Sequence, residues 1–202
     1  MKLNRDKSIK RYEIKFIFTK NNENYFDKIK NLKKIFPDRV VESIYYDTNQ
    51  FKFFSLSEEG ITPRIKVRIR GYNNGFLNNL EIKKTNNYDR EKIVIKNFEN
   101  SFVNFYKSLK KIGIDETLHE KLRVKYDRSY YHLKNIGRIT YDKNIQFSLP
   151  GKNKSSPISI DNTVMEVKVN SVFFDKVEVE KKVGFKESRF SKYCFGINKI
   201  YN

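Results

Sequence analysis

Polar and apolar residues alternate strictly from residue 64 to 70, where Arg64, Lys66, Arg68 and Arg70 are separated by isoleucine and valine. A period of two predicts a β-strand with one buried face, and it places the four basic side chains ~7 Å apart on the other face. Nothing within the strand offsets these aligned positive charges. This face is therefore either covered by water or made to meet a polyanion.

The same alternation recurs along most of the chain, and helical spacing interrupts it at a few places. We expect further strands over residues 11–18, 40–46, 77–85, 92–96, 122–131, 137–147 and 163–170. Apolar stripes predict helices over residues 21–36, ended by Pro37, and 99–112, ended by Gly113. We expect a hairpin turn at 71–75, loops over 51–63 and 148–162, and mixed helix and turn after residue 173. No linker or repeat divides the chain, so we expect a single domain over residues 1–202.

The composition adds a strong positive charge. Lysine and arginine outnumber aspartate and glutamate by 42 to 24, a net charge of +18. This excess indicates an anionic partner: nucleic acid, anionic lipid or a phosphorylated substrate. Aromatic residues make up 15% of the chain and can form a core although hydrophobic residues reach only 38%.

Several classes of protein are excluded by what the sequence lacks. The single cysteine, Cys194, allows no internal disulfide and no multi-cysteine zinc site. No apolar stretch is long enough to span a membrane, and the N-terminal residues do not form a signal peptide. We therefore expect a cytoplasmic protein.

The charged strand faces leave two arrangements open. On an open sheet, they would form a solvated face with cross-strand ion pairs. In a closed barrel, the same face would line a tunnel, and its basic side chains would neutralise a phosphate chain, these being Arg68, Arg70, Lys83, Arg123, Arg138 and Lys168. Carboxylates on that face, namely Glu13, Glu81 and Glu166, would hold a hard divalent cation. Periodicity alone does not decide between the two.

Short motifs occur along these strands in a particular order. They are Arg11-x-Glu13-x-Lys15, Ser43-Ile44-Tyr45-Tyr46-Asp47-Thr48, Arg64-x-Lys66-x-Arg68-x-Arg70-x-Tyr72, Leu80-Glu81-Ile82-Lys83, Arg123-x-x-Tyr126-x-Arg128, Arg138-Ile139-Thr140-x-Asp142, Met165-Glu166-Val167-Lys168 and Ser191-Lys192-Tyr193-Cys194. Together they resemble the VTC domain, the polyphosphate polymerase domain of the vacuolar transporter chaperone complex and its bacterial relatives. This domain belongs to the triphosphate tunnel, or CYTH-like, superfamily.

The resemblance implies an α+β fold in which an antiparallel β-barrel of about eight strands forms a basic tunnel with flanking helices. It implies transfer of the ATP γ-phosphate to a growing polyphosphate or pyrophosphate chain, with Mn²⁺ or Mg²⁺ as cofactor. Matching positions assign catalytic roles to Arg68, Arg70, Lys83, Arg123, Arg138 and Lys192. They assign substrate binding to Arg11, Lys15, Arg64, Lys66, Lys168 and Ser191, and metal binding to Glu166, Glu81 and Glu13.

Some motif residues are expected elsewhere. Arg128 has the opposite strand parity from Arg123, so we expect it outside the tunnel or at a bulge. We interpret the motif tyrosines as packing residues, these being Tyr45, Tyr126 and Tyr193.

Two departures from the superfamily affect the predicted activity. The first strand carries one acid, Glu13, where the triphosphatase branch has Glu-x-Glu-x-Lys, which argues against a triphosphate hydrolase. This sequence does not include the phosphate-sensing and membrane domains of the eukaryotic complexes, so we expect it to act alone or with a separate membrane partner. A hydrolase and a non-catalytic polyphosphate-binding module remain alternatives. Nucleic-acid binding is not expected, because the basic residues alternate with acids and no nucleic-acid motif is present.

Overall fold

The structure is a computed structural model that describes residues 4–6, 12–19, 24–87, 89–151, 156–169 and 175–202. Its strands pair antiparallel in one sheet. They are β1 (Asn4–Asp6), β2 (Tyr12–Phe18), β3 (Leu32–Asp47), β4 (Arg64–Tyr72), β5 (Asn79–Asn86), β6 (Asp89–Ile95), β7 (His119–Leu133), β8 (Gly137–Ser148), β9 (Ile158–Ser159) and β10 (Thr163–Val169). The helices are α1 (Asn24–Asp27), α2 (Lys52–Glu59), α3 (Phe102–Lys110), α4 (Lys176–Val183) and α5 (Lys192–Tyr201).

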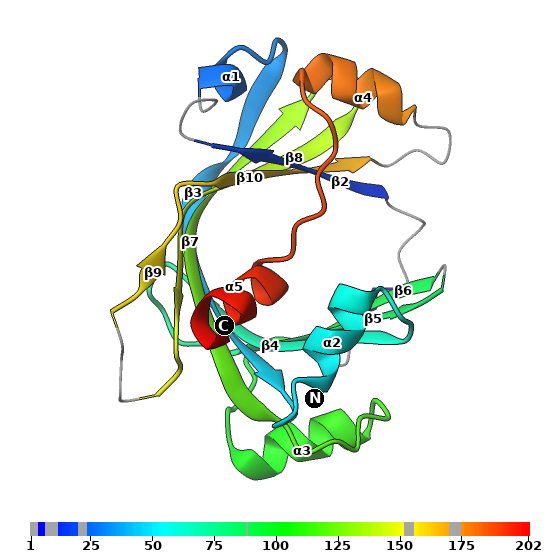
Figure 1. Cartoon of the computed structure of the whole chain (residues 1–202), viewed down its shortest axis with the longest axis vertical. Coiled ribbons are helices and arrows are strands. Elements are labelled where there is room, and N and C mark those ends of the chain that lie inside the picture. The colour runs from blue at the N-terminus through cyan, green and yellow to red at the C-terminus, as the bar shows by residue number, and fades with distance from the viewer. Residues whose placement is uncertain (1–3, 7–11, 20–23, 88, 152–155, 170–174) are drawn as a thin grey trace.

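The sheet curls back on itself, and we call its concave side the interior (Figure 1). Its strand order is β1-β6-β5-β4-β3-β7-β8-β10-β2, with β9 added to β8. The long strands β3 and β7 form the bend, and register shifts between Lys34 and Phe36 and between Phe36 and Arg39 accompany it (Figure 1). Among the described strands, no pairing joins β2 to β1 or β6. The predicted α+β fold with an antiparallel sheet is thus observed, but the sheet does not close into the predicted barrel, because both edge strands keep one unpaired side.

Apolar side chains cover the outer side of the curled sheet in two clusters. One lies between α3 and strands β3 to β6 and includes Ile69, Leu80 and Leu109. The other lies beneath α1 and α4, where Phe16 and Val167 of β2 and β10 are fully buried. This burial fixes which side chains face outward, so the alternate residues on the same strands face the interior.

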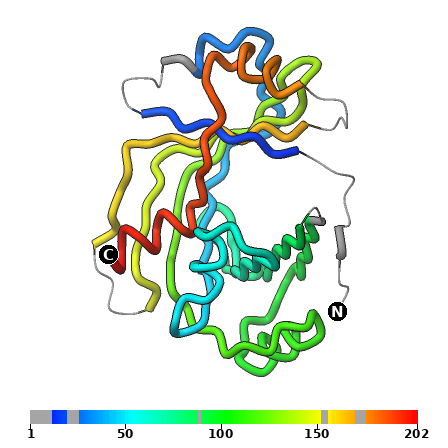
Figure 2. Tube along the Cα trace, turned by 45° about the vertical axis from the view of Figure 1, so that its right-hand side comes forward, coloured from blue at the N-terminus to red at the C-terminus, as the bar shows by residue number. Residues whose placement is uncertain are grey.

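Helix α5 occupies part of that interior. It packs on inward-facing residues of the bend, where Tyr193 and Ile197 meet Val41 and Leu122. The chain leading to α5 crosses from the α4 side of the molecule to the interior (Figure 2). The inner side of the sheet is therefore apolar beneath α5 and free to carry charge elsewhere. No helix in the described ranges is long and apolar enough to cross a membrane.

The predicted helix over residues 21–36 is wrong for most of its length. Among its described residues only Asn24–Asp27 are helical, and Asn31 then adopts a positive φ of 63°. From Leu32 the chain enters β3 and pairs with β7. Pro37 lies at the register shift, a place where a strand tolerates proline. Tertiary strand pairing has overridden the local helical spacing.

The predicted loop over residues 51–63 contains α2. The buried Asp47 carboxylate accepts hydrogen bonds from the backbone N–H groups of Phe53 and Phe54, at 2.9 Å each. Thr48 Oγ1 accepts a third from Lys52. These acceptors satisfy the free N–H groups of the first turn, although they lie outside the usual N-cap position, so the helix start is not evident from sequence.

Candidate functional site

The inward-facing residues of the curled sheet carry most of the charges predicted to form the site. Cross-strand registers place Arg68 beside Glu81, Lys66 beside Lys83 and Lys168 beside Glu13. Basic side chains outnumber carboxylates on this face. The basic side chains are Lys15, Lys66, Arg68, Arg70, Lys83, Lys92, Arg128, Lys168 and Lys192, and the carboxylates are Glu13, Glu81, Asp142 and Glu166.

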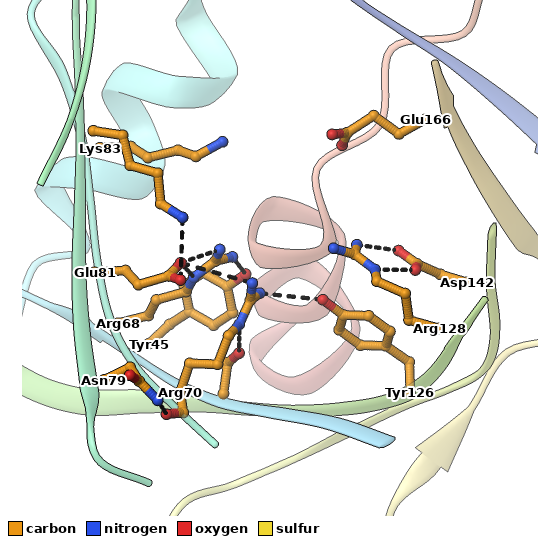
Figure 3. Close-up of polar contacts among 12 residues, drawn as sticks. Tyr45, Arg68, Arg70, Asn79, Glu81, Lys83, Tyr126, Arg128, Asp142 and Glu166 are labelled. Atoms are coloured by element: carbon orange, nitrogen blue, oxygen red, sulfur yellow. Dashed lines mark hydrogen bonds and ion pairs between the residues drawn. The ribbon is translucent and has the colours of Figure 1, made fainter. Parts of the chain in front are cut away.

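A first cluster surrounds Glu81 (Figure 3). This carboxylate is 4% exposed and accepts hydrogen bonds from Nε and Nη2 of Arg68, at 2.9 and 2.5 Å. Lys92 donates to it at 3.1 Å, and Arg70 lies 3.7 Å away. These cations lower the pKa of Glu81 against the effect of burial, so the carboxylate stays charged. We call these four residues the Glu81 cluster.

Hydroxyl groups fix the two arginines further. Arg70 donates to Ser43 Oγ at 3.0 Å and to the Tyr126 hydroxyl at 3.1 Å, and Arg68 donates to the Tyr45 hydroxyl at 2.9 Å. Tyr45 and Tyr126 are buried as predicted, but their hydroxyl groups also belong to the site. Burial alone would raise the pKa of Tyr45, yet Arg68 and Arg70 outweigh it and lower this pKa to about 8.

A second carboxylate, Asp142 of β8, holds two cations on the other side of the interior. Arg128 binds it with both ends of the guanidinium group, at 2.6 and 2.7 Å, and Lys192 of α5 donates at 2.5 Å (Figure 3). Asp142 is 1% exposed, and these two partners lower its pKa although burial opposes them. Asp142 thus anchors α5 to the sheet and orients Arg128.

A third group joins β2 and β10. The ammonium group of Lys168 lies 2.9 Å from Glu166 and 3.4 Å from Glu13, and Lys83 of β5 lies 4.0 Å from Glu13. We call these four residues the Glu166 cluster. The Lys83–Glu13 contact joins β5 to β2, which lie on opposite sides of the interior (Figure 1). Lys168, Lys15 and Lys83 lower the pKa of Glu166 well below its ordinary range, although burial opposes them.

The start of α5 lies against the same face. Ser191 caps the helix by accepting from the backbone N–H of Cys194, and Lys66 donates to Ser191 Oγ at 2.9 Å. Lys15 donates to the carbonyl oxygen of Phe190 at 2.8 Å. The predicted substrate-binding residues Lys15, Lys66 and Ser191 are therefore neighbours, although they come from three distant segments.

The basic residues on this face lack sufficient negative charge from the protein. Partial burial lowers the pKa of Lys83 to about 8, and Arg68 and Lys168 contribute to this shift while Glu13 and Glu166 oppose it. Burial likewise lowers the pKa of Lys66, assisted by Lys15 and Arg68. The lowered pKa of Tyr45 indicates a positive potential around Arg68 and Arg70, whereas the lowered pKa values of the two lysines follow mainly from burial.

Of the remaining predicted residues, the structure turns Arg123 away from the inner face and places Arg64 and Arg138 at its ends. Arg123 faces outward and forms an ion pair with Glu42, because the inward positions of β7 are Leu122, Val124 and Tyr126. Arg138 is exposed and lies cross-strand from Lys168. Arg64 is half-buried at the inward position before Lys66, and Arg11 lies outside the described residues.

Arg128 corrects the prediction made from strand parity. Its parity does differ from that of Arg123, but Arg128 is the residue that faces inward. The expected irregularity is present, as a register shift with β8 between Lys125 and Asp127. The prediction placed Arg123 on the inner face and therefore placed Arg128, of opposite parity, on the outer face or at a bulge. Packing of α5 on Leu122 and Val124 decides which parity faces inward, and the sequence of β7 carries no signal of that long-range contact.

Other contributors were also missed. Lys92 and Asp142 complete the charge clusters, and Asp142 ends the motif Arg138-Ile139-Thr140-x-Asp142. Thr140 lies beside Glu166 in the cross-strand register and is 2% exposed. In the described part of the chain, its hydroxyl oxygen has no hydrogen-bond partner.

The three predicted metal ligands do not meet. Glu13 and Glu166 share Lys168, whereas Glu81 is bound by arginines in a different cluster. In the described ranges, no group of three or more histidine, cysteine, aspartate or glutamate side chains is arranged to hold a metal ion. A cation at Glu13 and Glu166 would need oxygen ligands from its substrate, as is common for Mg²⁺.

Solved structures share this curled sheet. The PH1819 protein of Pyrococcus horikoshii is 17% identical, with a TM-score of 0.54 over 93% of this chain and 96% of its own. A Bacillus halodurans protein proposed to be an adenylate cyclase is 13% identical, with a TM-score of 0.53 over 91% and 96%. A Hippeastrum protein proposed to be an adenylyl cyclase, whose dominant activity is that of a triphosphatase, is 13% identical, with a TM-score of 0.50 over 95% and 97%. At these identities the likeness concerns the fold.

The family follows from the sequence itself. A model of the VTC domain matches residues 10–201, so the chain belongs to the VTC domain family, as its motifs predicted. No curated protein matches the chain significantly.

Proposed function

We propose that this protein is an ATP-dependent polyphosphate polymerase. The observation that carries the proposal is the surplus of inward-facing cations around fixed arginines, which suits a chain of phosphates. Membership of the VTC family and the absence of a second acid in the first-strand motif favour polymerisation over hydrolysis. Because the family match spans residues 10–201, we also propose that the chain acts as one VTC-like domain.

In the proposed reaction, a terminal oxygen of the polyphosphate chain attacks the γ-phosphorus of ATP. A new phosphorus–oxygen bond forms, the bond from the γ-phosphorus to the β,γ-bridging oxygen breaks, and ADP leaves with that electron pair. Arg68 and Arg70 would bind the transferring phosphoryl group, since Glu81, Ser43 and Tyr126 hold both guanidinium groups in place. Such preorganised charge supplies most of the catalysis that phosphoryl transfer needs.

Mn²⁺ or Mg²⁺ would be held by Glu13 and Glu166. Both offer charged, hard oxygen ligands, and both already share a cation in Lys168. The unpartnered Thr140 hydroxyl adds a polar atom beside Glu166. Glu81 does not fit a metal, because Arg68, Arg70 and Lys92 occupy it. When bound, the metal would neutralise charge on phosphate oxygens.

The test is incubation of the protein with ATP and Mn²⁺, followed by gel separation of the products. We expect a ladder of long polyphosphate, lost in Arg70→Ala and Glu166→Gln and retained in Lys107→Ala, which changes an exposed lysine on α3. Free phosphate without a ladder would indicate the hydrolase. Tight polyphosphate binding without ATP consumption would indicate a binding module.

A further inference from the structure

An aromatic group continues the inward-facing rows of the site. On β4, Tyr72 takes the next inward position after Arg70, and on β7, Tyr130 takes the next one after Arg128. Successive positions on one face are ~7 Å apart, so the Tyr72 ring adjoins Arg70, which is assigned to phosphate, and the Tyr130 ring adjoins Arg128 of the same inner face. Both tyrosines are half-buried.

Arg39 of β3 lies between these rings. Its guanidinium carbon is 6.0 Å from the centroid of Tyr72 and 5.8 Å from that of Tyr130. Arg39 is also the cross-strand neighbour of Arg128. Phe36 contacts Tyr130 edge-to-face at 5.9 Å and remains 50% exposed. We call Phe36, Arg39, Tyr72 and Tyr130 the aromatic rim.

The rim combines features that suit a planar, electron-rich ring. Arg39 and Phe36 are exposed, so a ligand can reach the guanidinium group and an aromatic ring together. Nucleobases stack on both kinds of group. Phosphate alone gains nothing from Phe36, which carries no charge and no hydrogen-bond donor on its side chain.

The inward-facing residues of β4 form a row that is aromatic at one end, at Tyr72, and basic at the other, at Arg64. Beyond Arg68, in the direction away from Tyr72, the inward positions are Lys66 and Arg64, and Lys66 contacts the start of α5. A nucleoside triphosphate bound along this row would therefore place its phosphates on the arginines and its base on the rim. Its terminal phosphate would then point toward Lys66, where the basic face continues for a growing chain.

We propose that the aromatic rim binds the base of the donor nucleotide. This deepens the proposed function, on which it rests, because it makes the donor a nucleoside triphosphate and gives it a direction along the site. It assigns donor specificity to Phe36 and Tyr130, which lie outside the phosphate-binding clusters.

The test compares the binding of ATP and of inorganic tripolyphosphate by calorimetry. In Phe36→Ala and Tyr130→Leu, we expect the Kd for ATP to rise about tenfold, the lower part of the range for loss of one base–aromatic stack. The Kd for tripolyphosphate should not change, which also shows that the variants are folded. Tyr130→Phe keeps the ring and should bind ATP as the original protein does. Phe102→Ala, on an exposed phenylalanine of α3, should leave both ligands unaffected.

Equal losses for ATP and tripolyphosphate, or no loss for either, would overturn the rim as a base site and leave the proposed function standing. A parent protein that binds neither ligand would contradict both the proposed function and the rim.

Discussion

Glu81 and Glu166 both face the interior of the curled sheet, but different kinds of cation hold them. Glu81 is bound mainly by Arg68, whose guanidinium group is fixed at several atoms, and Arg70 lies beside it. Glu166 is bound by Lys168, a single ammonium group that it shares with Glu13. Arginine offers a rigid planar fork, whereas lysine is a point charge on a flexible chain.

This difference indicates that the two clusters have different roles in substrate binding. The Glu81 cluster is set before substrate arrives, because its charges are already paired and hydrogen-bonded. In the Glu166 cluster, Lys168 is shared by two carboxylates, and burial lowers the pKa of Lys83 to about 8. Phosphate oxygens and a metal would enter at the Glu166 cluster and meet fixed arginines at the Glu81 cluster.

Removal of a fixed arginine should have the largest effect. Arg70→Ala should lower the initial rate of polyphosphate formation by about 10²- to 10³-fold, as expected for loss of a preorganised donor. Arg70→Lys should not restore it, since an ammonium group cannot reach Ser43 and Tyr126 together with the phosphate. A lysine variant with nearly the original rate would show that charge alone is required.

The two carboxylates should differ in their effect on folding. Glu81→Gln should lower the free energy of unfolding by about 3 kcal/mol, because two arginines and a lysine lose their buried counter-charge. Glu166→Gln should cost about 1 kcal/mol, since Lys168 keeps Glu13 as a partner. Urea denaturation of both variants measures this. Equal losses would contradict the proposed difference between the clusters.

The lowered pKa of Lys83 predicts a pH dependence of binding. Free Lys83 loses its proton as the pH rises through about 8. A bound polyanion favours the charged form, so binding takes up a proton and the affinity for tripolyphosphate should fall by up to about tenfold per pH unit above this value. Lys83→Arg stays charged and should remove this part of the fall, leaving the titration of Tyr45, of Lys66 and of the ligand itself. Calorimetry from pH 7 to 10 on the original protein and on Lys83→Arg separates the contribution of Lys83 from the other titrations. If the Kd for tripolyphosphate changes with pH in the same way in both proteins, Lys83 does not cause the fall in affinity.

The smallest effect should come from the start of α5. Ser191→Ala removes the helix cap and the acceptor for Lys66, and it should destabilise the protein by about 1 kcal/mol. Ser191→Asp keeps a capping oxygen and should recover most of that stability. Thermal unfolding of the two variants provides the measurement, and a fully stable alanine variant would contradict the role of Ser191.

Strand periodicity was sufficient to predict most of the sheet, and the motifs were sufficient to identify the family. The antiparallel pairing of β4 with β5 agrees with the hairpin turn predicted at 71–75, and the structure adds that its register sets Arg68 beside Glu81. The wrong predictions of secondary structure concern segments whose structure is determined by contacts with residues far away in the sequence. Leu32 belongs to a strand only because β7 pairs with it, and α2 begins where it does because Asp47 accepts its N–H groups.

Most residues of the candidate site were also predictable from the sequence, except on β7. Alternation assigned faces within each strand correctly, but it could not say which parity faces inward on β7. Packing of α5 on Leu122 and Val124 sets that parity, and no local signal reports it. This is why Arg123 was taken for a site residue and Arg128 was not.

We propose that the inner face of the sheet, rather than the positive charge of the whole chain, binds polyphosphate. Arg128 and Arg123 test it directly, because they lie on one strand, carry the same charge and face opposite sides. The Kd for tripolyphosphate should be measured for Arg128→Ala and Arg123→Ala at one ionic strength. We predict that Arg128→Ala weakens binding about tenfold or more, as expected for loss of a charge-assisted contact, and that Arg123→Ala leaves it unchanged. Equal weakening in both variants would contradict the account.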